Sequence, residues 1–334
     1  MSSDSELTRS LSTGFGLSTM TATSVGSTAH ARLRANGREG VVNGVFDGAV
    51  NILLAGGLIS LVPETGEMGP LNIKLRLPVG PDRMSSLGIR NGDRVIVHGS
   101  SLEVGNRHRI LFGSTGIYSP KRRFTVPMLE EDEIAANLEA ARSTALLFGN
   151  MAGLGQLLAL VGPRVDRAPS HNLNVFASAA LPRIVRLERA FRSEEESRVT
   201  NACSELIGLG PGLTPSSDDM LAGLVLLCVL YSRNCGRAQR ATRLIAQAAA
   251  AEALGKTTTL SEEYLRQAAW GRGNERVMRL CTTMLTEGRE SVERETRRVL
   301  AIGETSGTDT VLGIVIGTVL CLGKTSSLAR GEFQ

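Results

Sequence analysis

A polar, glycine-rich loop directly before an apolar segment holds the side chains best suited to chemistry. Residues 208–227 read GLGPGLTPSSDDMLAGLVLL, so that three glycines, two prolines, a threonine and two serines precede the adjacent acids Asp218 and Asp219. The helix predicted after them is apolar on every side, which indicates a buried helix whose polar start lies near the interior. Because a buried carboxylate is costly without a compensating partner, the two aspartates require an explanation.

Two interpretations of these acids remain open at the level of the sequence. In the first, Asp218 and Asp219 only offset the helix dipole, which is worth roughly 0.3–1 kcal/mol each. In the second, the backbone N–H groups of residues 210–214 and the helix N-terminus bind an oxyanion, a phosphate or a carboxylate, because glycine lets the backbone approach a ligand closely. An aspartate would then hold an amide, a water molecule or Mg²⁺.

A second motif near the C-terminal end repeats this arrangement. Residues 303–317 read GETSGTDTVLGIVIG, and Thr305 precedes Asp309 by the same spacing that separates Thr214 from Asp218. We therefore expect the two helix starts to face one site. The predicted catalytic acids are Asp218, Asp219 and Asp309, and the predicted substrate- or phosphate-binding residues are Gly208, Gly210, Gly212, Thr214, Ser216, Thr305, Ser306 and Gly307. Asp218 and Asp219 are the candidate ligands if Mg²⁺ is bound, and no other cofactor is predicted.

Two further polar clusters have structural explanations. In KTTTLSEEYLRQAAWGRG, which begins at Lys256, Thr259 and Glu262 have the spacing of a helix capping box. A stripe of arginines lies on one predicted helix, at Arg233, Arg237, Arg240 and Arg243. Aromatic residues are 4% of the chain and none interleaves with this stripe, which favours a solvated face over a nucleic-acid groove.

The composition excludes several classes of protein. The 37 Lys and Arg residues against 33 Asp and Glu leave a formal charge of +4, too small a surplus to indicate a nucleic-acid partner, whereas small anionic substrates fit. Five cysteines without a CxxC pair and four histidines without a close pair argue against a disulfide framework and a zinc site, and favour a reduced, cytoplasmic protein. The longest apolar runs, 220–231 and 311–322, are shorter than the ~20 residues of a membrane span, so we expect buried core helices and no membrane partner.

The hydrophobic pattern predicts an α+β protein with a β-rich N-terminal domain followed by a mainly helical C-terminal domain. LNIKLRLP alternates apolar and polar residues, which is the period of a strand with one wet face. The apolar run FDGAVNILLAGGLISLVP fits either a strand or a helix. After Pro127 the period becomes helical, beginning with MLEEDEIAANLEAARSTALLFGN, whose acids suit a helix N-terminus and whose Gly149 suits a C-cap.

The same pattern places the boundaries of the domains and helices. We predict a disordered tail at 1–23, the β-rich domain at 24–127, the helical domain with both motifs at 128–323 and a frayed tail at 324–334. Further helices are predicted at 151–161, 175–191, 194–207, 215–231, 236–253, 261–270, 274–301 and 309–322.

GLGPGLTPSSDDMLAG resembles the signature of the AllH-like family, formerly a domain of unknown function and now associated with a subunit of oxamate carbamoyltransferase in allantoin breakdown. GETSGTDTVLG resembles the second motif of that family, and FDGAVNILLAGGLISLVP followed by GPLNIKL resembles its N-terminal half. Ser217 stands where the family often has glycine, a change that makes the loop slightly stiffer. The chain lacks the Ser-Thr-Arg-Thr phosphate loop of the aspartate and ornithine transcarbamoylases, since ARSTALL at 141–147 lies within a predicted helix.

The resemblance implies that the protein helps to transfer a carbamoyl group between an oxalurate-like compound and phosphate, as one of several different subunits. Preorganised N–H donors at a helix start suit an oxyanion and a phosphate, but no general base is evident in the sequence. A hypothesis of another class is a non-catalytic assembly subunit, or a small-anion-binding subunit, of a heteromeric complex. Both hypotheses predict partner subunits, and the first also predicts a small anionic substrate.

Overall fold

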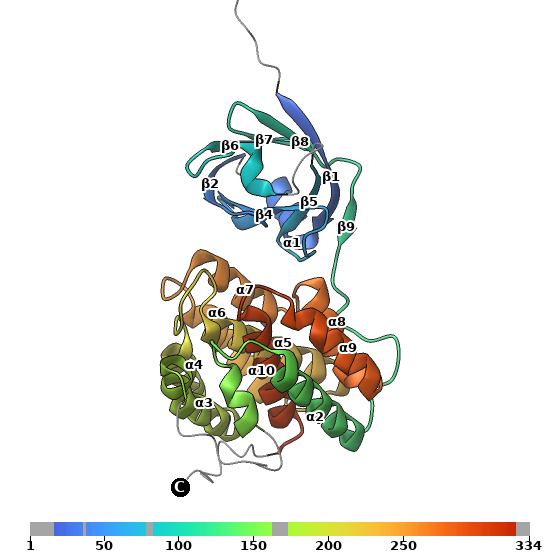
Figure 1. Ribbon diagram of the computed structural model, residues 1–334, viewed down its shortest axis with the longest axis vertical. Helices are drawn as coiled ribbons and strands as arrows, with labels where there is room; N and C mark the ends of the chain where they lie inside the picture. The colour runs from blue at the N-terminus through green and yellow to red at the C-terminus, as the bar shows by residue number, and fades with distance from the viewer. Residues whose placement is uncertain (1–16, 36–37, 78–82, 162–172, 325–334) are drawn as a thin grey trace, which may run out of the picture. The chain divides into compact units, whose positions relative to one another are not determined.

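The computed structural model describes residues 17–35, 38–77, 83–161 and 173–324, which form two compact units. The first unit combines the residues up to Gly66 with 71–117 and is β-rich, and the second combines 67–70 with the residues from Tyr118 onward and is mainly helical (Figure 1). The predicted α+β class, with a β-rich region before a helical one, is therefore confirmed. Of the predicted tails at 1–23 and 324–334, residues 1–16 and 325–334 lie outside the described residues.

The β unit is one sheet that curls into a barrel-like form. Its strands are β1 (Ser18–Gly26), β2 (Glu39–Val45), β3 (Val50–Leu54), β4 (Gly57–Pro63), β5 (Asn72–Arg76), β6 (Arg94–His98), β7 (Ser101–Val104), β8 (His108–Leu111) and β9 (Gly116–Tyr118), with the helix α1 (Ser27–Arg34) and the short 3₁₀ helix η1 (Met84–Leu87). The strand order is β5-β4-β3-β2-β6-β7-β8-β1-β9, and β1 also pairs with β5. That extra pairing joins strands from distant places in the order, as closure of a barrel requires.

The period-two pattern of the sequence explains how the sheet buries its core. In β5, Ile73 and Leu75 are buried while Arg76 is exposed, as the alternation in LNIKLRLP predicts. The apolar run FDGAVNILLAGGLISLVP, whose pattern fitted either a strand or a helix, forms a β-hairpin. Its strands β3 and β4 are antiparallel, with Val50 opposite Leu61 at one end and Leu54 opposite Gly57 at the turn. β1 begins at Ser18, inside the segment expected to be a tail, and the strands end at Tyr118, before the expected boundary near Pro127.

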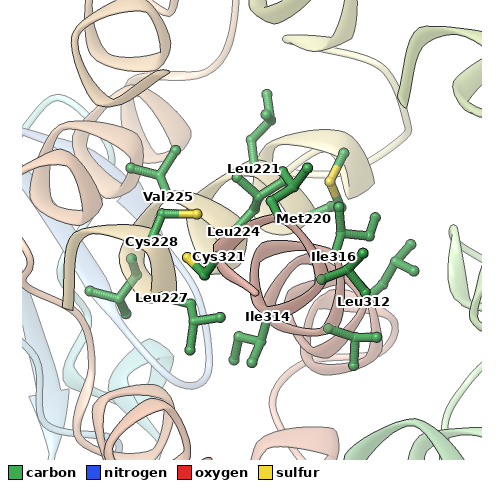
Figure 2. Packing of buried hydrophobic residues seen from close by; sticks show 14 of the residues in the cluster. Met220, Leu221, Leu224, Val225, Leu227, Cys228, Leu312, Ile314, Ile316 and Cys321 are labelled. Carbon is green, nitrogen blue, oxygen red and sulfur yellow. The ribbon is translucent and has the colours of Figure 1, made fainter. Parts of the chain in front are cut away.

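The helical unit is built around two central apolar helices, α5 (Ser216–Cys235) and α10 (Ser306–Cys321). Its other elements are α2 (Glu131–Phe148), η2 (Gly155–Leu160), α3 (Val175–Ser193), α4 (Glu196–Leu206), α6 (Gln239–Glu252), α7 (Thr259–Ala269), α8 (Glu275–Thr286) and α9 (Arg289–Leu300). Figure 2 shows Leu224 and Leu227 of α5 in one cluster with Ile316 and Cys321 of α10. Both helices are buried along nearly their whole length, as the uniformly apolar sequence predicts. None of the described helices is long and apolar enough to cross a membrane.

Two predicted helices take a different form. Residues 274–301 form α8 and α9 instead of one helix, because Glu287 and Gly288 have extended backbones. The Asn137 side chain on α2 donates to the carbonyls of Met284 and Glu287, at 3.1 and 2.8 Å, and so satisfies the end of α8. Residues 151–161 form a turn and the 3₁₀ helix η2 instead of an α-helix.

Glycines let α5 and α10 touch backbone to backbone. A Cβ atom at Gly313 would lie 1.9 Å from the Met220 carbonyl oxygen, and one at Gly223 would lie 2.3 Å from that of Thr310. Side chains at these positions would force the helices apart, because packed interiors absorb extra atoms poorly. The glycine pair therefore fixes how the first turns of the two helices meet.

We expect Gly313→Ala to destabilise the fold by at least about 2 kcal/mol, because the helices must separate to admit the methyl group. In a helix without this contact the same change would stabilise by up to about 1 kcal/mol, so the sign of the effect tests the packing. Gly288→Ala is the matched control, since no atom lies within 4 Å of a Cβ placed there. Denaturant unfolding measures both variants, and a Gly313→Ala protein as stable as the wild type would contradict the expectation.

Candidate functional site

The structure brings the two sequence motifs into contact. The Thr214 Oγ1 atom, in the loop before α5, lies 3.1 Å from the Ser306 Oγ atom at the start of α10. Residues 92 positions apart in the sequence thus share a hydrogen bond, and both are partly exposed. The starts of α5 and α10 therefore lie next to each other, and a ligand site shared by them stays a prediction.

The loop before α5 needs its glycines for two physical reasons. Gly208, Gly210 and Gly212 have φ angles of 81°, 123° and 94°, which L side chains rarely adopt. A Cβ at Gly210 would also lie 2.6 Å from the Ser216 nitrogen, so the loop folds tightly onto the start of the helix. No Cβ contact exists at Gly212, which lies at the exposed outer part of the loop.

Backbone donors in this loop are available to a ligand. Within the described part of the chain, no protein acceptor is found for the N–H groups of Gly210, Gly212, Leu213 and Thr214. The loop leads directly into the N-terminus of α5, where the helix dipole favours negative charge. These donors have the character of an anion-binding turn.

Asp218 holds the glycine loop in place. Its Oδ1 atom accepts a hydrogen bond from the Gly208 N–H at 2.8 Å, and its Oδ2 atom accepts one from the Thr257 hydroxyl at the start of α7. Burial raises the pKa of this carboxyl, while the hydrogen bonds from Thr257, Gly208 and Ser261 oppose the rise. Each oxygen of Asp218 thus has a hydrogen-bond partner within the fold.

Ser217 joins the loop to the end of α4. Its hydroxyl donates to the Leu206 carbonyl at 2.5 Å and accepts from the Leu209 N–H at 3.0 Å. The Ser217 hydroxyl therefore cross-links the loop to α4, and its side chain is fully buried. Sequence analysis missed this role because Ser217 differs from its polar neighbours only in its tertiary partners.

Asp219 and Asp309 are the unusual acids of the site. Asp219 is 8% exposed and Asp309 is fully buried. Each has a buried Oδ2 atom that has no hydrogen-bond partner among the described residues. The other oxygen of Asp309, Oδ1, accepts from the Leu154 N–H at 2.7 Å. Unpartnered carboxylate oxygens in an interior are rare and costly, so they need a proton or a ligand.

The surroundings of these two acids raise the pKa of both carboxyl groups. Burial raises the pKa of Asp219 well above its ordinary value, the hydroxyls of Ser306 and Thr214 oppose this, and the charge of Asp309 adds to it. Burial also raises the pKa of Asp309, to about 6, against the effect of Ser216, the Leu154 N–H and Thr305. Burial thus favours the neutral form of Asp219, whereas the pKa of Asp309 is about 6.

Two residues that the sequence analysis missed line the acid pair. A Cβ at Gly153 would lie 2.5 Å from the Asp309 Oδ2 atom and 2.8 Å from the Ser216 Oγ atom, so the backbone before η2 closes one wall of the site. Although 40% of the Tyr264 residue is exposed, burial and the charge of Asp219 raise the pKa of its phenol to about 12. Neither residue belongs to a motif, because each reaches the site through the packing of another element.

Gly307 is a packing residue. A Cβ there would lie 2.1 Å from the Val299 carbonyl oxygen, at the end of α9. Its N–H donates to the Ile302 carbonyl at 2.9 Å, so it is not available to a phosphate. Of the predicted binding residues near α10, Thr305 and Ser306 face the acids and Gly307 faces α9.

The described residues contain no cluster of three or more His, Cys, Asp or Glu side chains arranged to hold a metal ion. The candidate ligands if Mg²⁺ is bound, Asp218 and Asp219, differ in their partners: Asp218 accepts hydrogen bonds from Gly208 and Thr257, whereas the Asp219 Oδ2 atom has none among the described residues. Binding of Mg²⁺ by these acids stays a prediction.

Two family models match the chain in order. The model described as oxamate carbamoyltransferase subunit AllH matches residues 206–318, which span both motifs. The model of the AllH family N-terminal domain matches residues 21–117, which make up nearly all of the described β unit. No solved structure matches the chain. The motifs that carry the resemblance in the sequence thus lie within the matched regions.

We expect Asp309→Asn to stabilise the protein at neutral pH and not in acid. The pKa of Asp309 is raised from 3.8 to about 6, so its proton stabilises the fold below the unfolded pKa, and this contribution is lost as the pH rises through about 6. The variant should therefore melt at a higher temperature than the wild type at about pH 7.5, with an upper bound of roughly 3 kcal/mol, and the difference should vanish toward about pH 4.

Thermal melts of both proteins across this pH range test the expectation. Asp132→Asn is the control, because Asp132 is an exposed acid in the first turn of α2. An equal gain at every pH would show that Asp309 does not carry the buried titration.

Proposed function

The chain belongs to the AllH family, and we propose that it is a carbamoyltransferase subunit whose active-site residues lie at the starts of α5 and α10. The proposed reaction converts an oxamate-like acceptor and carbamoyl phosphate into an oxalurate-like product and phosphate. It would belong to allantoin catabolism or to a related pathway of nitrogen catabolism. The observation that carries the proposal is the pair of buried carboxylate oxygens, Asp219 Oδ2 and Asp309 Oδ2, where the two motif loops meet.

Carbamoyl transfer requires a proton acceptor and a stabilised oxyanion. The acceptor's amide nitrogen attacks the carbamoyl carbon, a C–N bond forms, and the C–O bond to phosphate breaks with its electron pair leaving on phosphate. The proton from the attacking nitrogen goes to a carboxylate. Asp309 suits this role because its pKa of about 6 leaves it mostly ionised at cytoplasmic pH and still basic enough to accept a proton.

Asp219 suits the complementary role of a hydrogen-bond donor. Its pKa is raised well above the ordinary value, so the neutral acid is favoured and can donate its O–H toward the developing oxyanion or the leaving phosphate. The partly exposed Thr214 and Ser306 interact with this carboxyl and with each other. In this proposal their hydroxyls connect Asp219 to the bound substrate by hydrogen bonds. In this proposal Asp309 and Asp219 are the base and the acid that the sequence did not reveal.

The glycine loop is the proposed binding place of the anionic group. The N–H groups of Gly212, Leu213 and Thr214 are available there, and the N-terminus of α5 adds its dipole. Ser216 and Thr305 position Asp309 from either side. Asp218, which the sequence grouped with the catalytic acids, is in this proposal a positioning residue that fixes Gly208.

The proposal includes partner subunits and a cytoplasmic location. The family description names a subunit, so the remaining substrate contacts are expected from other chains. The five cysteines, Cys203, Cys228, Cys235, Cys281 and Cys321, are free thiols, as suits a reducing compartment. A non-catalytic assembly or small-anion-binding subunit is the alternative, and in that case the acids would be dispensable for turnover.

In the reconstituted complex we expect Asp219→Asn and Asp309→Asn each to lower kcat by at least roughly tenfold, about 1.4 kcal/mol. The double variant should lose much less than the product of the two, because the acids act on one reaction step. Carbamoyl-transfer rates and melting temperatures are measured together, with the exposed Asp132→Asn as the matched control. Small, strictly additive losses in folded complexes would favour the non-catalytic alternative.

The purified chain alone is expected not to phosphorolyse oxalurate. Its acids and loop provide one side of a site, and the family description implies other subunits. A coupled phosphate-consumption assay with the isolated chain, and then with its partners added, checks this point. Turnover by the isolated chain at the rate of the complex would refute it.

A further inference from the structure

The β unit has a hollow beside the end of α1. Its volume is about 380 Å³, which lies within the range of roughly 300–1,000 Å³ that small-molecule sites occupy. One wall is a face of α1, where His30 is followed by Leu33 and Arg34 three and four positions later. The facing wall includes Val97 on β6 and Phe112, which follows β8. All the residues that line the hollow belong to the β unit.

The buried part of the lining is apolar. Leu33, Val97 and Phe112 are each no more than 6% exposed, although they border the hollow. An aliphatic or aromatic group that entered would contact these side chains and leave water, which favours binding. The hollow therefore suits a ligand with an apolar body.

The polar part of the lining is basic. His30 is half-buried, and the side chains of Arg34 and Arg38 are exposed. None of the described residues that line the hollow is an acid. Guanidinium groups stay charged and match a carboxylate through two parallel N–H donors, so the exposed part of the hollow suits a negatively charged group.

A second hollow, between α3 and α4, shows what a neutralised arginine cluster looks like. Its volume of about 340 Å³ is similar, and Arg186, Arg189 and Arg198 line it. However, Glu205 also lines that hollow and pairs with Arg186 at 2.6 Å. The two hollows thus have a similar size and number of cations, and differ in the acid that only the helical one contains.

Backbone hydrogen bonds hold the walls of the first hollow in place. The Val97 N–H donates to the Arg38 carbonyl at 2.7 Å, and the Phe112 N–H donates to the Ser100 carbonyl at 2.9 Å. The Arg32 guanidinium donates to a backbone carbonyl of β4, which anchors α1 on the sheet. A ligand would therefore meet preformed walls and would lose little free energy in ordering them.

We propose that the hollow beside α1 binds a small organic anion with an apolar body. The negative group would lie against Arg34 and Arg38, and the apolar body would lie over Leu33, Val97 and Phe112. An ion as small as acetate would reach the arginines without covering the apolar lining. A neutral ring would cover the apolar lining without pairing with the arginines.

Benzoate, benzyl alcohol and acetate separate these contributions. Each is titrated into the full-length protein at constant ionic strength, balanced with chloride, and binding is followed by saturation-transfer NMR. We expect benzoate to bind at least roughly tenfold more tightly than either other probe. Equal binding of benzyl alcohol would show only an apolar crevice, and equal binding of acetate only a charged surface, so that either result would overturn the proposal.

Variants locate the binding. The Arg34→Gln/Arg38→Gln protein should bind benzoate at least roughly tenfold more weakly than the wild type does. Arg90→Gln/Arg94→Gln is the matched control, because it removes two exposed arginines of the β unit that do not line the hollow. Wild-type affinity in the first variant, or an equal loss in the control, would contradict the assignment.

Reversing the charge gives a test that loss of folding cannot imitate. In the Arg34→Glu/Arg38→Glu protein the preference should invert, so that benzylammonium binds at least roughly tenfold more tightly than benzoate. A retained preference for benzoate would place its binding elsewhere and overturn the proposal. Asp309→Asn should leave benzoate binding unchanged, because this hollow is independent of the proposed carbamoyl-transfer site.

Discussion

The close contact between α5 and α10 is the constraint on which the rest of the helical unit depends. Gly223 and Gly313 let the two backbones meet, so the first turns of both helices start at the same place. The Thr214–Ser306 hydrogen bond and the proximity of Asp219 to Asp309 follow from that alignment. Larger residues where the two helices cross would shift the start of one helix relative to the start of the other. Even a small shift would disturb the relative positions of the polar groups at the two helix starts. Packing between α5 and α10 thus determines how the polar groups at their first turns are placed.

The site keeps features that lower the stability of the fold. Two buried carboxyl oxygens lack partners, although neighbouring hydroxyls and the Leu154 N–H show that the same region satisfies polar atoms where it can. Asp218 makes the contrast clear, because its two oxygens are both hydrogen-bonded. The dipole of α5 gains little from a second acid in its first turn. Retained strain of this kind is typical of positions that serve a ligand or a reaction.

The sequence was sufficient for features that depend on local pattern. It predicted the α+β class, the two buried apolar helices and the meeting of their first turns, since periodicity and motif spacing are read along the chain. It could not predict the division of 274–301, because Asn137 on α2 makes that division by hydrogen bonds across the fold. Gly153 and Tyr264 escaped notice for the same reason, and Gly307 was assigned to a ligand although its N–H is used by Ile302.

The two ends of α5 carry opposite charges in the sense that the helix dipole favours, with acids in the first turn and Arg233 in the last. The dipole is equivalent to only about half a charge at each end, so it offsets a fraction of either group. At the acidic end a proton can relieve part of the remaining charge, because burial raises the pKa of Asp219 well above its ordinary value. At the basic end this route is closed, since a guanidinium stays charged at any pH in the cell. The asymmetry is chemical: a proton can remove the charge of Asp219, whereas Arg233 keeps its charge at the partly exposed end of the helix.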